Sequence, residues 1–149
     1  MNHFIQSISC AVVLTALTAQ AAFSGDGFSN DNFSNDSAVV MNNILTRTSI
    51  RKFQQRPVEK AKVLALLKAG MAAPTARDLR PWHFVVLSDT ADIHAYASTM
   101  KHHGEMIAQS PVVIYACGDT TRMMEGQARD FWVEDVSCVS ENILLAAHA

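Results

Sequence analysis

The sequence predicts one folded domain that mixes helices with strands, over residues 38–149. Two continuous apolar runs, at residues 82–87 and 111–117, are typical of buried strands. Residues 59–72 and 129–149 instead carry apolar side chains at helical spacing. Because continuous apolar strands are usually covered on both faces, we expect helices to cover both faces of the sheet.

The first 22 residues resemble a secretory signal peptide. An apolar run within residues 5–22 ends at Ala19-Gln20-Ala21, an A-x-A type cleavage site. The run is short for a transmembrane helix. No Lys or Arg occurs before Arg47, which departs from the charged start of a typical signal peptide. We therefore expect an exported protein, periplasmic or anchored in the membrane if the segment stays uncleaved. If the segment is not a working signal, or the start lies further downstream, the protein is cytoplasmic.

Residues 23–37 have the composition of a linker. Gly, Ser, Asn and Asp dominate, and Phe-Ser-Asn-Asp occurs twice, starting at Phe28 and Phe33. Such sequences behave as disordered tethers. The next segment, residues 37–46, predicts a short amphipathic helix that Asp36 or Ser37 caps.

The remaining elements follow from periodicity and from helix-breaking residues. In residues 59–72, an apolar stripe of Val63, Leu64, Leu67 and Met71 predicts a helix that ends before Pro74. A loop bracketed by prolines, residues 74–81, leads into the first strand. Further helices are predicted at residues 91–100 and 105–109, before the second strand. The last helix carries a packing stripe of Trp132, Val136, Val139 and Ile143.

Composition excludes several kinds of site. The net charge of −2 gives no basic footprint for nucleic acid. Cys117 and Cys138 lie in apolar surroundings without a close partner, so we interpret them as small buried side chains. His83 and the run Lys101-His102-His103 lack ligands at metal-binding spacing, and we predict no metal site.

The cluster Arg47-Thr48-Ser49-Ile50-Arg51 holds the candidate binding residues. If the segment is extended, Arg47, Ser49 and Arg51 point the same way, and Ile50 and Phe53 are free to face a core. Two guanidinium groups that flank a hydroxyl suit a phosphate. The alternative is a solvated basic turn before a helix.

Three blocks together resemble the nitroreductase family of flavoproteins. They are residues 47–53, residues 73–82, and Trp132 to Asp135 leading into residues 141–147. Their order and spacing agree with the family. The resemblance implies an α+β fold with a central sheet wrapped by helices, incomplete in this chain. It also implies a homodimer with FMN bound at the subunit interface.

The resemblance assigns roles to particular residues. Arg47, Thr48, Ser49 and Arg51 would hold the FMN phosphate. The loop that contains Asp78 and Arg80 would lie along the flavin ring, where the family usually has Asn and Gln at these positions. An ionised carboxylate only accepts hydrogen bonds, so Asp78 would accept one from the flavin N3–H. Arg80 would approach the ring carbonyls. An Asp78–Arg80 surface ion pair is the alternative. We name no catalytic residue.

The implied activity is hydride transfer from NAD(P)H through bound FMN to a nitroaromatic, a quinone or a similar small aromatic acceptor, by a ping-pong mechanism. One alternative is another flavin enzyme of the superfamily, such as a dehalogenase, an oxidase or a flavin-cleaving enzyme. The other is a non-enzymatic exported binding protein with a degenerate flavin site. The chain ends within a helical pattern, so we expect a truncated domain that is inactive alone.

Overall fold

The computed structural model describes residues 35–149. The predicted signal peptide and most of the predicted linker lie outside these residues. The chain divides into two units, residues 1–40 and 41–149. The described part of the first unit is residues 35–40, and the fold below is that of the second unit.

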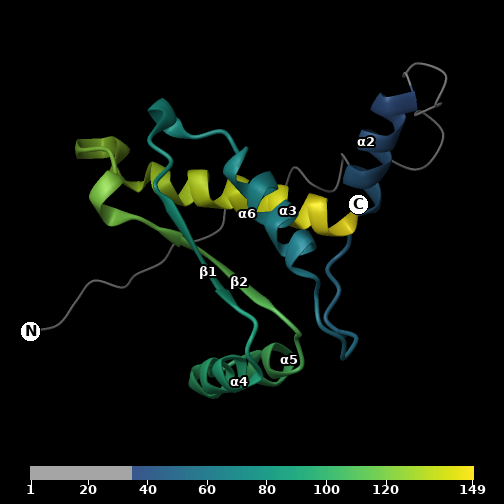
Figure 1. Ribbon diagram of the computed structural model, residues 1–149. Helices are drawn as coiled ribbons and strands as arrows, with labels where there is room; N and C mark the ends of the chain where they lie inside the picture. Colours follow the sequence, from purple (N-terminus) through teal and green to yellow (C-terminus); the bar gives the residue numbers. More distant parts are fainter. Residues whose placement is uncertain (1–34) are drawn as a thin grey trace, which may run out of the picture. The chain divides into compact units, whose positions relative to one another are not determined.

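The described chain consists mainly of helices, with two strands among them (Figure 1). The α-helices are α2 (Asn35–Thr46), α3 (Lys60–Met71), α4 (Thr90–Thr99), α5 (Gly104–Ala108) and α6 (Trp132–His148). Short 3-10 helices are η2 (Ala76–Asp78), η3 (Thr120–Arg122) and η4 (Gly126–Phe131), and the strands are β1 (Trp82–Leu87) and β2 (Val113–Gly118). Among these residues no helix is long and apolar enough to cross a membrane.

The predicted element order is confirmed, with small differences at the ends. Strand β1 has the predicted bounds, whereas α6 begins at Trp132 because the preceding residues form η4. Helix α2 begins at Asn35, so the end of the predicted linker, residues 35–37, is helical. Asp36 and Ser37 therefore lie inside the helix and not at its cap, and Asp36 is in its first turn.

Strands β1 and β2 form an antiparallel pair in which Trp82 faces Gly118 and Leu87 faces Val113. Burial alternates along β1, since Trp82 is buried whereas Val85 is 48% exposed. The expectation that both faces of the strands are covered is therefore wrong for β1. An antiparallel pair can pack one face on the core and leave the other in water, and β1 follows that pattern.

The core forms where α6 meets the strand pair. Ala73, Trp82 and Val139 are buried together, and Val139 is 0% exposed. Phe84, Ala116, Val136 and Ile143 pack around them. The predicted α6 stripe and the burial of Trp82 are both confirmed. Gly118 lies against Trp132, because a β-carbon placed there would collide with the indole ring.

Helices α3 and α6 cross in close contact (Figure 1). A β-carbon on Gly70 would lie 3.0 Å from the Ile143 side chain, so the small residue permits the close approach. Asn142 donates a hydrogen bond to the Ala69 carbonyl at 3.1 Å. The predicted α3 stripe is wrong at Leu64 and Met71, which are exposed. Helix α3 instead contacts α6 at Ala69 and Gly70, which lie outside the predicted stripe.

Candidate functional site

The loop that connects α3 to β1 is tied to the first turns of α6. Ala76 N–H donates to Asp135 Oδ1 at 2.9 Å, and the Thr75 hydroxyl donates to Asp135 Oδ2 at 3.3 Å. Thr75 Oγ1 in turn accepts the Arg80 N–H at 3.0 Å. Asp135 is 7% exposed. One buried carboxylate on α6 thus holds both ends of residues 76–80.

The same loop has an unusual backbone. Arg77, Asp78 and Arg80 have φ angles of 54°, 57° and 49°, in the left-handed region. For a residue with a side chain, this conformation costs about 1–2 kcal/mol. Such strain persists only where the surrounding contacts enforce it, and it concentrates at functional sites. The loop is therefore the first candidate site.

Asp78 and Arg80 contact each other across this loop. Arg80 Nε donates to Asp78 Oδ1 at 2.7 Å, and both side chains are exposed. This surface ion pair was one of the two alternatives that the sequence left open. Exposed pairs of this kind contribute only about 0–1 kcal/mol, so a ligand can replace the contact at small cost.

The basic cluster begins where α2 ends. Arg47 is partly buried, with 26% of its side chain exposed, and its Nε lies 3.5 Å from Glu141 Oε1 on α6. The side chains of Thr48, Ser49 and Arg51 are exposed, and among the described residues they have no hydrogen-bond or ion-pair partner. Ile50 is 67% exposed, and Phe53 is also exposed, so the expectation that they face a core is wrong.

Helix α6 carries both regions. Asn43 donates to the Leu145 carbonyl at 3.0 Å, and Thr46 contacts His148 at 2.9 Å, which fixes the end of α2. Asp135 and Glu141, which hold the loop and Arg47, are six residues apart, or about 9 Å along the helix axis. The structure thus brings the predicted site residues onto a common support, with the cluster and the loop at different turns.

Sequence reasoning missed Asp135 and Thr75 as functional residues. The available signal was the position of Asp135, four residues before Val139 and three after Trp132. That spacing puts a carboxylate on the apolar face of α6, where an acidic side chain needs hydrogen-bond partners. Glu141 was also missed, because nothing in the sequence indicates that it contacts Arg47.

A second region lies at the end of the loop. The Asp119 N–H donates to the Pro81 carbonyl at 2.8 Å, and the Asp119 carboxylate accepts from Thr121 N–H and Oγ1 at 2.9 and 2.6 Å. His83 Nε2 lies 3.0 Å from the same carboxylate. The Thr121 hydrogen bonds, with a smaller effect of His83, hold the pKa of Asp119 below its ordinary value of 3.8. These contacts fix the step from the loop into β1.

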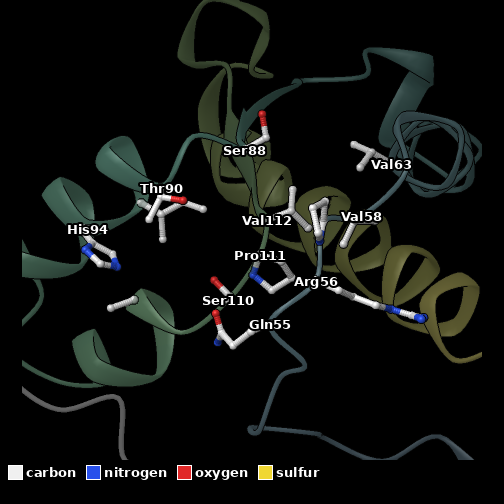
Figure 2. A pocket seen from close by; sticks show the side chains of 13 residues that line it. Gln55, Arg56, Val58, Val63, Ser88, Thr90, His94, Ser110, Pro111 and Val112 are labelled. Carbon is white, nitrogen blue, oxygen red and sulfur yellow. The ribbon is translucent and has the colours of Figure 1, made fainter.

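A cavity of about 450 Å³ lies away from both regions (Figure 2). Residues 55–58, the start of α4 and residues 110–112 line it. Figure 2 shows the Arg56 side chain pointing away from Thr90 and Ser110. Asp89 already accepts the free N–H groups of Ala91 and Asp92, so the start of α4 offers no site for an anion. We therefore assign no binding function to this cavity.

The described residues include two thiols and several imidazoles. Cys117 is half-buried and Cys138 is exposed, so the prediction that both are buried is wrong for Cys138. Both are free cysteines. Within residues 35–149, no group of three or more His, Cys, Asp or Glu side chains is arranged to hold a metal ion.

Comparison with known proteins identifies the fold and shows which family the chain resembles. Residues 44–102 match the family model described as "Nitroreductase family". A relative from Methanothermobacter thermautotrophicus, named "Putative NADH dehydrogenase/NAD(P)H nitroreductase", is 40% identical over 116 residues, or 74% of this chain. The chain spans 56% of that relative's length.

Solved structures show the same similarity. A protein of the same name from Parabacteroides distasonis is 38% identical, with a TM-score of 0.66. The match covers 74% of this chain and 62% of that protein's chain. The FMN-dependent nitroreductase from Clostridium difficile is 31% identical with a TM-score of 0.64, and 72% of this chain covers 60% of it. The predicted α+β, nitroreductase-like fold is confirmed, and the chain is similar to proteins of the nitroreductase family.

Proposed function

We propose that this chain supplies the phosphate-binding and ring-edge residues of an FMN site in an NAD(P)H-dependent oxidoreductase. One observation carries the proposal: α6 holds both a basic cluster and a strained polar loop. These are the two regions that the family resemblance assigns to one flavin. The family itself supports an oxidoreductase that uses NAD(P)H.

The basic cluster fits a phosphate. The Arg51 guanidinium and the hydroxyls of Thr48 and Ser49 are exposed donors without a partner among the described residues. A phosphomonoester offers three acceptor oxygens and about two negative charges at neutral pH. Arg47 already contacts Glu141 at 3.5 Å, and a phosphate would compete with that carboxylate. We therefore assign Arg51 as the main phosphate ligand, with Arg47 second.

The loop fits the polar edge of a flavin ring. That edge offers a ring N–H and carbonyl oxygens. Asp78 would accept a hydrogen bond from that N–H and Arg80 would donate to the carbonyls, so each would exchange its present partner for a ligand atom. Because the loop backbone is fixed at both ends, these side chains are presented from one position. The similarity to an FMN-dependent nitroreductase supports this assignment.

Bound FMN supplies the redox chemistry, carrying hydride equivalents from NAD(P)H to a nitroaromatic, a quinone or a similar acceptor in two separate half-reactions. The residues described here bind and orient it. We assign no general acid or base among them, because hydride transfer to and from a flavin requires neither from these side chains.

The test uses the purified full-length protein. We expect a yellow protein, or one that takes up added FMN, whose flavin absorbance near 450 nm bleaches under anaerobic NADH or NADPH. Addition of a quinone or a nitroaromatic should restore the colour. A colourless protein that takes up no FMN overturns the proposal. Flavin that binds but is not bleached supports another superfamily enzyme or a non-enzymatic binding protein.

We also propose that the complete protein is a homodimer and is exported through residues 1–22. Size-exclusion chromatography with light scattering tests the first proposal, and N-terminal sequencing of the protein from its source tests the second. An exported protein does not meet cytosolic NAD(P)H. A mature N-terminus near residue 22 would therefore require another reductant outside the cytoplasm.

A further inference from the structure

We propose that Asp135, acting through Thr75, is a positioning residue that sets the backbone of residues 76–80, with its three positive φ angles, and so places Asp78 and Arg80 against the flavin. The inference rests on the proposed function. It concerns residues that contact the loop and would not themselves contact the cofactor.

The hydrogen bonds form a continuous chain. The Arg80 N–H donates to Thr75 Oγ1 at 3.0 Å, and the Thr75 hydroxyl uses its one proton on Asp135 Oδ2 at 3.3 Å. The other carboxylate oxygen accepts the Ala76 N–H at 2.9 Å. The remaining hydrogen bonds are local. They run from Asp78 N–H to the Thr75 carbonyl, from Leu79 N–H to the Ala76 carbonyl, from Trp82 N–H to the Arg80 carbonyl and from Arg80 Nε to Asp78 Oδ1. Among the residues that the structure describes, Asp135 therefore supplies the hydrogen bonds that join residues 75–80 to α6.

The energetics require such a contact. Three residues with positive φ, Arg77, Asp78 and Arg80, cost roughly 3–6 kcal/mol together if each costs 1–2 kcal/mol. The ion pair between Arg80 and Asp78 is exposed, and it contributes at most about 1 kcal/mol to the free energy of unfolding. A buried carboxylate, in contrast, must keep its hydrogen bonds, because losing them leaves a desolvated charge. Burial of Asp135 thus enforces the loop conformation.

The loop conformation in turn determines which way Asp78 and Arg80 point. A residue that relaxes from positive to negative φ turns its side chain away from its former direction. Loss of the Thr75 hydroxyl frees the Arg80 N–H and removes one acceptor contact of Asp135. We therefore expect the ring edge of the flavin to lose its ordered partners, while the phosphate cluster near residues 47–51 is unaffected.

The experiment compares Thr75→Val with Thr75→Ser in the full-length protein. Valine keeps the shape and removes the hydroxyl, whereas serine keeps the hydroxyl and is the matched control. Asp135→Asn is the second test, because its amide oxygen still accepts from Ala76 N–H but its nitrogen can no longer accept the Thr75 proton. Asp135→Ala removes both contacts and risks misfolding, so it is not relied upon.

Two readouts are needed. The first is cofactor-independent: amide hydrogen exchange of residues 76–80, and trypsin cleavage after Arg77, in the protein without flavin. In Thr75→Val we expect exchange and cleavage about five- to tenfold faster, as for the loss of one or two hydrogen bonds. The second is the reduction potential and the absorption spectrum of bound FMN. Both should shift in Thr75→Val and Asp135→Asn and return in Thr75→Ser.

The outcomes separate the two proposals. If the wild-type protein binds no FMN, the proposed function fails, and the exchange and cleavage data still test whether Asp135 and Thr75 set the loop. If Thr75→Val lowers only the melting temperature, with unchanged loop exchange and an unchanged flavin potential, the two residues are merely structural and the inference is wrong. Faster loop exchange with a shifted potential supports it.

Discussion

The loop at residues 74–81 and the basic cluster at residues 47–51 are held in opposite ways. The loop is strained and is fixed by a buried carboxylate of the protein itself, Asp135. The cluster lies outside any helix or strand. Apart from Arg47, its polar side chains have no hydrogen-bond or ion-pair partner among the described residues. A preformed loop pays its ordering cost during folding, whereas an open cluster pays it on binding. We therefore expect the loop to set orientation and the cluster to supply affinity.

The largest effect should come from the support that both regions share. Val139→Ala removes two methyl groups from a fully buried position on α6, and we expect a loss of about 2–3 kcal/mol in the free energy of unfolding. Urea unfolding measures it. Val133→Ala is the matched control on the same helix, since Val133 is exposed. Equal losses in the two variants would show that Val139 is not a core residue in solution.

The next effect separates cluster from loop. Arg51→Ala should weaken FMN binding about 10- to 100-fold, because charge-assisted hydrogen bonds contribute about 1.5–3 kcal/mol each. FMN fluorescence quenching measures the affinity. Arg56→Ala is the control, since Arg56 is exposed and close in sequence but outside the cluster. If both variants bind FMN like the wild type, residues 47–51 are a solvated basic turn.

A smaller effect tests the strain in the loop. Arg77→Gly should raise the free energy of unfolding by up to about 1 kcal/mol, because glycine adopts φ near 54° without steric cost. Arg122→Gly in η3 serves as the control, and there glycine should be neutral or destabilising. A loss of stability in Arg77→Gly measured by thermal unfolding would contradict the left-handed backbone at this position.

The smallest effect concerns the end of the loop. Because hydrogen bonds from Thr121 lower the pKa of Asp119 in the folded protein, its carboxylate stabilises the fold above its ordinary pKa of 3.8. That contribution is lost as pH falls through the lowered value. Asp119→Asn should therefore flatten the acid limb of the stability curve, measured by urea unfolding between pH 3 and pH 6. Asp130→Asn, on an exposed residue, controls for net charge. An unchanged acid limb in Asp119→Asn would contradict the shift.

The sequence predicted the positions of helices and strands well, and predicted less well which side chains pack against one another. The period-2 and period-3.6 patterns located β1 and the α6 stripe, since burial of one face leaves a direct trace in the residue types. The same rule misled at Leu64 and Met71, because α3 contacts α6 through Gly70, and a glycine adds nothing to a hydrophobic pattern. It also misled at Ile50 and Phe53, whose exposure depends on what packs nearby.

The candidate site divides in the same way. Arg47, Thr48, Ser49, Arg51, Asp78 and Arg80 were predicted from residue chemistry and from the family resemblance. Their roles stay predictions until FMN binding is measured. Asp135, Thr75 and Glu141 were not predicted, because each acts through a partner at least 59 residues away in the sequence or through another such residue. Contacts of that range leave no local pattern.

By itself, the sequence determined which segments are helix or strand, the absence of a basic nucleic-acid footprint, and the family to which the chain is similar. These properties depend on local periodicity, composition and short motifs. Only the tertiary structure decided that a buried carboxylate on α6 holds a loop in which Arg77, Asp78 and Arg80 have positive φ, and that Glu141 contacts Arg47. The physical reason is that folding brings α6 against segments far away in the chain, and the resulting hydrogen bonds can hold a backbone that no local preference would select.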